Sequence, residues 1–145
     1  MEYHKIDKDS IEDVLERAKQ YRSLLQPDMA ISICMDIFAV DKNNQEALVI
    51  YILALTDELS QSESKVHQKK INDSIKRLDS KFLRHYYSGI FFERQARSLL
   101  KHSMSRSFAY EAFIEAIAEF EIAEKMVPEH CADPILRYNS CIRTI

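Results

Sequence analysis

The segment Ala116-Ile-Ala-Glu-Phe120-Glu-Ile-Ala123-Glu-Lys-Met-Val-Pro128 carries the clearest structural signal in this chain of 145 residues. Small or apolar residues recur in it at steps of three and four, from Ala116 through Phe120 to Ala123. This spacing places them on one side of an α-helix. Pro128 then ends the helical pattern, because proline has no backbone N–H to donate. The segment predicts the last turns of a helix whose small side chains let a second helix approach closely.

The same periodicity extends outward from this segment over the rest of the chain. Asp9 or Ser10 is the expected N-cap of the first helix, and Pro27 and Pro134 stand where helices start. No segment alternates with the two-residue period of a strand. Seven helices are expected, approximately at 11–25, 29–40, 47–59, 64–78, 80–99, 109–127 and 133–145. Joined by short connections, they predict an all-α antiparallel array in one domain.

Glycine is scarce, with one residue in 145 beside three prolines. Hairpin turns and phosphate-binding loops use glycine where the backbone needs a positive φ. Gly89 alone cannot complete a Walker loop or a G-x-G-x-x-G dinucleotide motif. The composition therefore excludes the common nucleotide-binding loops and argues against an all-β fold.

Charge and cysteine content narrow the function classes further. Twenty Lys and Arg against 23 Asp and Glu give a net charge of −3, with both signs interleaved, which argues against nucleic-acid binding. No apolar run is long enough for a membrane span, and no leader pattern precedes the first helix, so a cytoplasmic protein is expected. The three cysteines lack metal-binding spacing and are expected to be reduced. We expect no metal, no cofactor and no catalytic site.

Two windows of the sequence resemble the tetratricopeptide repeat, a helical hairpin of about 34 residues. The first window is Ala18-x-x-Tyr21 followed by Ala30-x-x-x-Cys34-x-x-Ile37, and the second is the segment from Ala116 to Pro128. The resemblance implies about three divergent repeats stacked as a right-handed superhelix. Their approximate hairpins are 9–44, 45–79 and 80–130, with a capping helix at 133–145.

The single glycine has a specific place in this register. Gly89-x-x-Phe92 repeats the small-then-aromatic step of Ala18-x-x-Tyr21. The register therefore predicts that the helix at 80–101 pairs with the helix that contains Ala116. Gly89 is expected where those two helices come closest.

The resemblance also implies a function, because tetratricopeptide domains are usually non-catalytic adaptors that hold a peptide or a partner helix in a concave groove. Lys19, Arg22 and Arg94 are expected to hold acidic groups of a ligand, and Tyr86 is expected to be accessible. The groove positions that the register transfers to this chain are Lys19, Arg22, Leu53, Asp57, Tyr86, Ile90, Glu93 and Arg94.

Three alternatives remain beside this interpretation. The chain is an ordinary α-helical bundle in one, and its alanines match the repeat by coincidence. In another it is a structural protein that forms a symmetric homodimer through the same apolar residues. In the third it is a helical enzyme or sensor, which predicts an ordered cleft where His85 or His130 lies beside a carboxylate.

Overall fold

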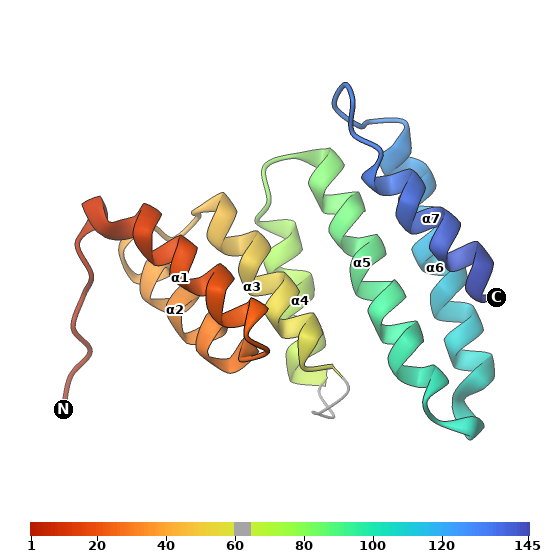
Figure 1. Ribbon diagram of the computed structural model, residues 1–145, viewed down its shortest axis with the longest axis horizontal. Coiled ribbons are helices and arrows are strands. Elements are labelled where there is room, and N and C mark those ends of the chain that lie inside the picture. The colour runs from red at the N-terminus through yellow and green to blue at the C-terminus, as the bar shows by residue number, and fades with distance from the viewer. Residues whose placement is uncertain (60–64) are drawn as a thin grey trace. The chain divides into compact units, whose positions relative to one another are not determined.

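The computed structural model describes residues 1–59 and 65–145, and all regular structure in these ranges is helical (Figure 1). The α-helices are α1 (Ile11–Ser23), α2 (Pro27–Val40), α3 (Gln45–Asp57), α4 (Lys65–Lys76), α5 (Lys81–Leu100), α6 (Arg106–Glu124) and α7 (Asp133–Thr144). Two 3-10 turns, η1 (Lys8–Ser10) and η2 (Ser103–Ser105), precede α1 and α6. The predicted all-α class with seven helices is confirmed for the described part of the chain.

The first helix begins after Ser10, one of the two predicted N-cap residues, but a different side chain caps it. Ser10 occupies the N-cap position of α1, but its side chain makes no capping hydrogen bond. The capping side chain is Asp7, whose carboxylate accepts a hydrogen bond from the Asp9 N–H at 3.1 Å and so begins η1. An added 3-10 turn thus moves the side-chain cap three residues upstream of Ser10.

Other helix starts follow the sequence directly. Pro27 is the first residue of α2, and Pro134 lies in the first turn of α7, where a missing N–H costs nothing. The Asn44 side chain accepts a hydrogen bond from the N–H of Ala47 at 2.9 Å and caps α3. Ser80 caps α5 in the same way through Leu83.

The chain divides into two compact units, Met1–Glu58 and Leu59–Ile145. In unit 1, α2 packs against both α1 and α3, and α3 also contacts α1. Its core is a cluster of buried residues from the three helices: Leu15, Ala18, Cys34, Ile37, Ala47 and Ile50. Phe38 and Tyr51 pack edge to face beside this cluster, with ring centroids 5.4 Å apart.

Unit 2 is built around the long antiparallel pair of α5 and α6 (Figure 1). The C-terminal helix α7 packs against α6 and also contacts α5, while α4 contacts α5. Each helix of unit 2 contributes side chains that are almost completely buried, including Ile71, Ile90, Phe113, Phe120 and Cys141. The predicted hairpin at 80–130 thus corresponds to α5 and α6, and the predicted cap corresponds to α7.

The three predicted hairpins map differently onto the two units. The hairpin at 9–44 corresponds to α1 and α2 within unit 1. The predicted hairpin at 45–79 combines α3 of unit 1 with α4 of unit 2. Its connection at 60–64 lies outside the described residues.

Gly89 lies at the close approach of α5 and α6, as the register predicts. A Cβ atom at this position would lie 2.5 Å from Cε1 of Phe120, well inside the van der Waals contact distance. Its φ angle is not positive, so packing rather than backbone freedom explains the glycine. Phe120 itself is completely buried, and therefore the ring has little room to move away.

Among the described residues, the left-handed backbone positions are occupied by residues other than glycine. Leu25, between α1 and α2, has φ 62°, and His130, between α6 and α7, has φ 65°. Non-glycine residues seldom adopt this conformation because Cβ crowds the following carbonyl. The chain thus forms these two helix connections with positive φ and without glycine.

None of the helices in residues 1–59 and 65–145 is both long and apolar enough to cross a membrane.

Candidate functional site

The eight residues predicted to line a groove are divided between the two units. Lys19, Arg22, Leu53 and Asp57 belong to α1 and α3 of unit 1. The other four, Tyr86, Ile90, Glu93 and Arg94, belong to α5 of unit 2. Each set is therefore described within its own unit.

The predicted residues of unit 1 include an ion pair. Arg22 Nε donates a hydrogen bond to Asp57 Oδ2 at 2.7 Å, and a second guanidinium nitrogen donates to Oδ1 at 3.2 Å. This bidentate pair joins the last turn of α1 to the last turn of α3. Because Arg22 already has a carboxylate partner, an acidic ligand would have to displace Asp57.

Lys19 lies one turn earlier on the same helix and is also paired. Its ammonium group donates a hydrogen bond to Glu16 at 3.1 Å and lies 3.8 Å from Glu46 of α3. The pKa of Lys19 is raised, first by the hydrogen bond and charge of Glu16 and then by Glu46. Leu53 is half-buried on α3. Two of the three basic residues expected to receive a ligand, Lys19 and Arg22, thus already contact acidic groups of unit 1.

Two predicted groove residues of unit 2 lie inside the protein. Ile90 is 1% exposed and Glu93 is 2% exposed, so neither is available to a partner in this arrangement. Tyr86 and Arg94 are half-buried. The Tyr86 ring contacts Phe82, Tyr87 and Phe120, so the aromatic cluster is used largely for packing.

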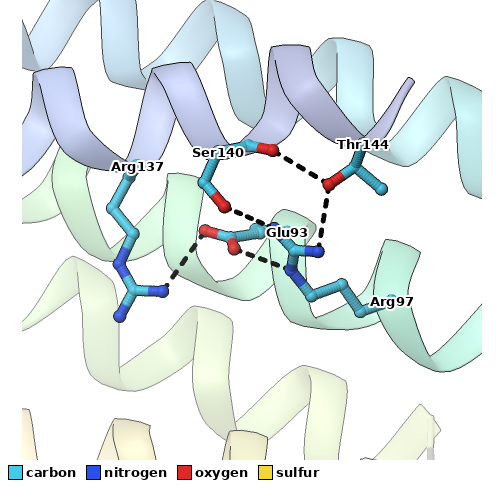
Figure 2. Close-up of polar contacts among 5 residues, drawn as sticks. All are labelled: Glu93, Arg97, Arg137, Ser140 and Thr144. Carbon is cyan, nitrogen blue, oxygen red and sulfur yellow. Dashed lines mark hydrogen bonds and ion pairs between the residues drawn. The ribbon is translucent and has the colours of Figure 1, made fainter.

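Glu93 is buried within a polar cluster that joins α5 to α7 (Figure 2). Its Oε2 accepts a hydrogen bond from Arg97 Nε at 2.8 Å, and its Oε1 lies 3.6 Å from a guanidinium nitrogen of Arg137. Arg97 also donates to the hydroxyl of Ser140 at 2.9 Å and to that of Thr144 at 3.2 Å. Residues separated by more than 40 positions in the sequence thus form one network.

The cluster also affects neighbouring titratable groups. The pKa of the Cys141 thiol is raised to about 11, first by burial and then by the charge of Glu93, while Arg97 and Arg137 oppose the shift. Burial likewise raises the pKa of Tyr86, against a hydrogen bond and the charge of Arg137. A neutral thiol is not a reactive nucleophile. We therefore interpret the cluster as a structural connection between two helices.

The repeat register, extended along α5, predicted that Glu93 is exposed in a ligand groove. The i, i+4 spacing of Glu93 and Arg97 was visible as a helical ion pair. Nothing in the local sequence indicated that Arg137, on the next helix but one, covers the same carboxylate. The predicted cap therefore occupies a surface that was assigned to a ligand.

Both histidines expected in an enzyme or sensor lie beside a carboxylate. His85 Nδ1 of α5 lies 2.7 Å from Glu119 Oε2 of α6, and both side chains are about three-quarters buried. His130 Nε2 lies 3.5 Å from Glu129, and both of those side chains are almost fully exposed. In the described part of the chain, no group of three or more His, Cys, Asp or Glu residues is arranged to hold a metal ion.

An apolar stripe on α6 was missed by the sequence reasoning. It consists of Tyr110, Ile114, Ala118 and Ile122, which are all exposed and follow one another at steps of four. The opposite side of α6 is also apolar and contributes Ala116 and Phe120 to the interior. The signal was present in the sequence, because α6 has apolar residues on more of its circumference than one core face needs.

Comparison with known proteins adds no family to this description. No protein-family model matches the chain, and neither a curated protein nor a solved structure does. Over residues 1–59 and 65–145 the structure defines an all-α protein with seven α-helices, and consecutive helices pack against each other within each unit.

Proposed function

We propose that this protein is a non-catalytic interaction module, an adaptor or scaffold, that binds a partner protein through the apolar stripe of α6. The observation that carries this proposal is the exposure of three large side chains, 56% for Tyr110, 42% for Ile114 and 38% for Ile122. Exposed apolar residues that are adjacent on one helix face are typical of protein interaction surfaces. Isolated exposed apolar residues would not support the same conclusion.

The finer architecture that we propose is a divergent tetratricopeptide-like stack. Two observations support it: α3 contacts both helices of the α1–α2 hairpin, and α7 contacts both helices of the α5–α6 hairpin. A following helix that packs on both members of the preceding hairpin is how helical repeats bury their apolar faces. Gly89 at the close contact of α5 and α6 fits the small position of such a hairpin.

The proposed surface differs from the groove that the family resemblance implies. On α5, Ile90 and Glu93 are buried, and Arg137 of α7 contacts Glu93. On α1, Arg22 is bound to Asp57. The stripe on α6 has its large side chains already exposed, so a partner can reach it without first breaking an ion pair.

Site-specific photo-crosslinking tests the proposal. A photoreactive benzophenone amino acid replaces Ile114 or Ile122 in the full chain, and Asn72, exposed on α4 of the same unit, serves as the matched control. After irradiation in cells that produce the protein, mass spectrometry identifies the covalent products. We expect one product with a different protein at both α6 positions and none at Asn72.

The same experiment can contradict the proposal in two ways. Crosslinks that join only copies of this chain would favour the self-associating structural protein instead. Equal products at Ile114 and Asn72, or no product at either α6 position, would show that the stripe binds no partner protein.

A further inference from the structure

Acidic residues border the apolar stripe of α6. Between Ser107 and Glu124 this helix contains five Glu and neither Lys nor Arg. Glu111 and Glu115 lie along one side of the stripe and Glu121 along the other, and all three side chains are exposed. The surface therefore combines an apolar centre with negative charge on both edges.

We propose that the α6 stripe binds an amphipathic helix of a partner protein whose apolar face is bordered by Lys or Arg. The inference rests on the proposed function and names the chemistry of the partner. Apolar side chains from the partner would contact Tyr110, Ile114 and Ile122, and its basic residues would meet the bordering glutamates. An acidic helix would place like charges opposite each other and is therefore excluded from the site.

The dimensions of the stripe favour a helix as the ligand. Tyr110 and Ile122 are twelve positions apart, which corresponds to about 18 Å along a helix axis at 1.5 Å per residue. A partner helix of three to four turns lying along α6 would span this distance. Such a helix presents its anchors at positions i, i+4 and i+7 or i+8, and thus matches a stripe with steps of four.

A second copy of the chain fits this surface less well. In a symmetric pair the same patch faces itself, so Glu111 and Glu115 of one copy would approach the glutamates of the other. A head-to-tail pair could instead use the basic helix α4, whose exposed side chains include Lys65, Lys69 and Lys70. The only exposed large apolar residue of α4 (Lys65–Lys76) is Val66, so that helix offers charge but no apolar face.

Fluorescence anisotropy with two synthetic helical peptides tests the inference on the full chain. Both peptides have 18 residues with leucines along one face; one has lysines beside the leucines, and the other has glutamates at the same positions. We expect the chain to bind the lysine peptide at least tenfold more tightly. The affinity should fall as salt is added, because the bordering charges are exposed.

Charge variants locate the binding. The triple variant Glu111→Gln, Glu115→Gln and Glu121→Gln removes the border and should weaken binding of the lysine peptide at least fivefold. The matched control neutralises three exposed acidic residues of unit 1 and should bind the peptide as the wild type does. Its substitutions are Asp9→Asn, Glu12→Gln and Asp13→Asn. Circular dichroism shows whether both variants keep their helices.

Apolar variants supply the second criterion. The double variant Ile114→Ser and Ile122→Ser should also weaken the lysine peptide at least fivefold while leaving the helix content unchanged. Equal effects of the two charge variants would overturn the inference, because they would indicate general attraction to an acidic protein. An unchanged affinity in the Ile variant would overturn it as well.

Sedimentation velocity of the chain alone distinguishes the remaining occupant. A dimer that the Ile114→Ser and Ile122→Ser substitutions dissociate would show that a second copy covers the stripe, and the inference would fail. A partner crosslinked at Ile114 together with equal affinity for both peptides would leave the proposed function standing and overturn only the basic-helix inference.

Discussion

In unit 1 (α1–α3) and in the last three helices of unit 2 (α5–α7), the third helix packs on both preceding helices. The two groups differ in the ion pair that joins their first and third helices. In unit 1 an arginine of the first helix, Arg22, pairs with an aspartate of the third, Asp57. In unit 2 the signs are reversed, because Glu93 of α5 faces Arg137 of α7. Asp57 keeps 22% of its side chain exposed, whereas Glu93 keeps 2%. The same helix order thus tolerates either polarity, but burial makes the second pair far more dependent on its partners.

The close contacts within the two hairpins show a second difference. In unit 1 the small position holds Ala18, and Cys34 belongs to the same core cluster. In unit 2 the corresponding positions hold Gly89 and Phe120, whose ring occupies the space of a Cβ. A larger residue on one helix therefore requires a smaller one on the other.

Among the substitutions that test this comparison, Gly89→Leu should cause the largest loss of stability. Even the added Cβ would lie 2.5 Å from the Phe120 ring, so α5 and α6 must separate or the ring must leave the core. We expect a loss of more than about 3 kcal/mol in the free energy of unfolding, beyond the usual range for overpacking. Chemical denaturation followed by circular dichroism measures it.

Two variants control this experiment. Asn72→Leu places the same side chain at an exposed helical position and should change the stability by less than about 0.5 kcal/mol. Phe120→Leu should partly relieve Gly89→Ala, so that the double variant loses less stability than the sum of the single variants. A thermal melt of Gly89→Leu that equals the wild type would contradict the close contact.

The second largest loss of stability is expected when the ion pairs between α1 and α3 and between α5 and α7 are removed. The double variant Arg97→Met and Arg137→Met leaves Glu93 buried without its cationic partners and should cost about 2 kcal/mol, less than a fully buried pair because both arginines are partly exposed. Arg22→Met should cost about 1 kcal/mol or less, because Asp57 can be hydrated.

Adding Glu93→Gln to the double variant separates charge from packing. If the cost arises from a buried unpaired carboxylate, the amide should restore about half of the lost stability. Urea denaturation of the three variants gives the values. Equal losses in Arg22→Met and the double variant would show that the difference in burial between the two units has no energetic consequence.

These residues also show which parts of the structure were predictable. Helical periodicity predicted seven helices, because repeated apolar spacing acts locally. Gly89 was predictable for a similar reason, since a glycine within a helix costs stability unless packing requires it. The burial of Glu93 was not predictable, because it depends on Arg137, which lies 44 positions away. The α6 stripe was visible as excess apolar circumference, but only the fold shows which side stays exposed.

The buried thiols offer a reactivity comparison of the two units. Burial raises the pKa of Cys34 to about 12 and, aided by Glu93, that of Cys141 to about 11. The thiolate is the reactive form of cysteine. At pH 8 roughly one Cys34 thiol in ten thousand and roughly one Cys141 thiol in a thousand would be thiolate. Cys131 is half-buried, and iodoacetamide should label it at least ten times faster than either.

Mass spectrometry of the labelled peptides measures the three rates. For Cys34 and Cys141 the rates should keep rising with pH up to pH 10, because both thiols titrate above that value. If Cys34 were labelled as fast as Cys131, unit 1 would open locally much more often than its buried core suggests.

The smallest effect is expected at the two left-handed connections. Leu25→Gly removes a strained Cβ from a side chain that is 87% exposed, so little apolar contact is lost. The relief of about 1–2 kcal/mol exceeds the entropic cost of glycine, about 0.5–1 kcal/mol, and leaves a gain of about 0.5 kcal/mol. His130→Gly should gain less, because histidine adopts positive φ more readily than leucine.

Leu24→Gly, at the neighbouring residue with φ −81°, has no strain to relieve and should destabilise unit 1. Denaturant midpoints compare the three variants, and a loss in Leu25→Gly equal to that in Leu24→Gly would mean that the αL strain at this connection is negligible.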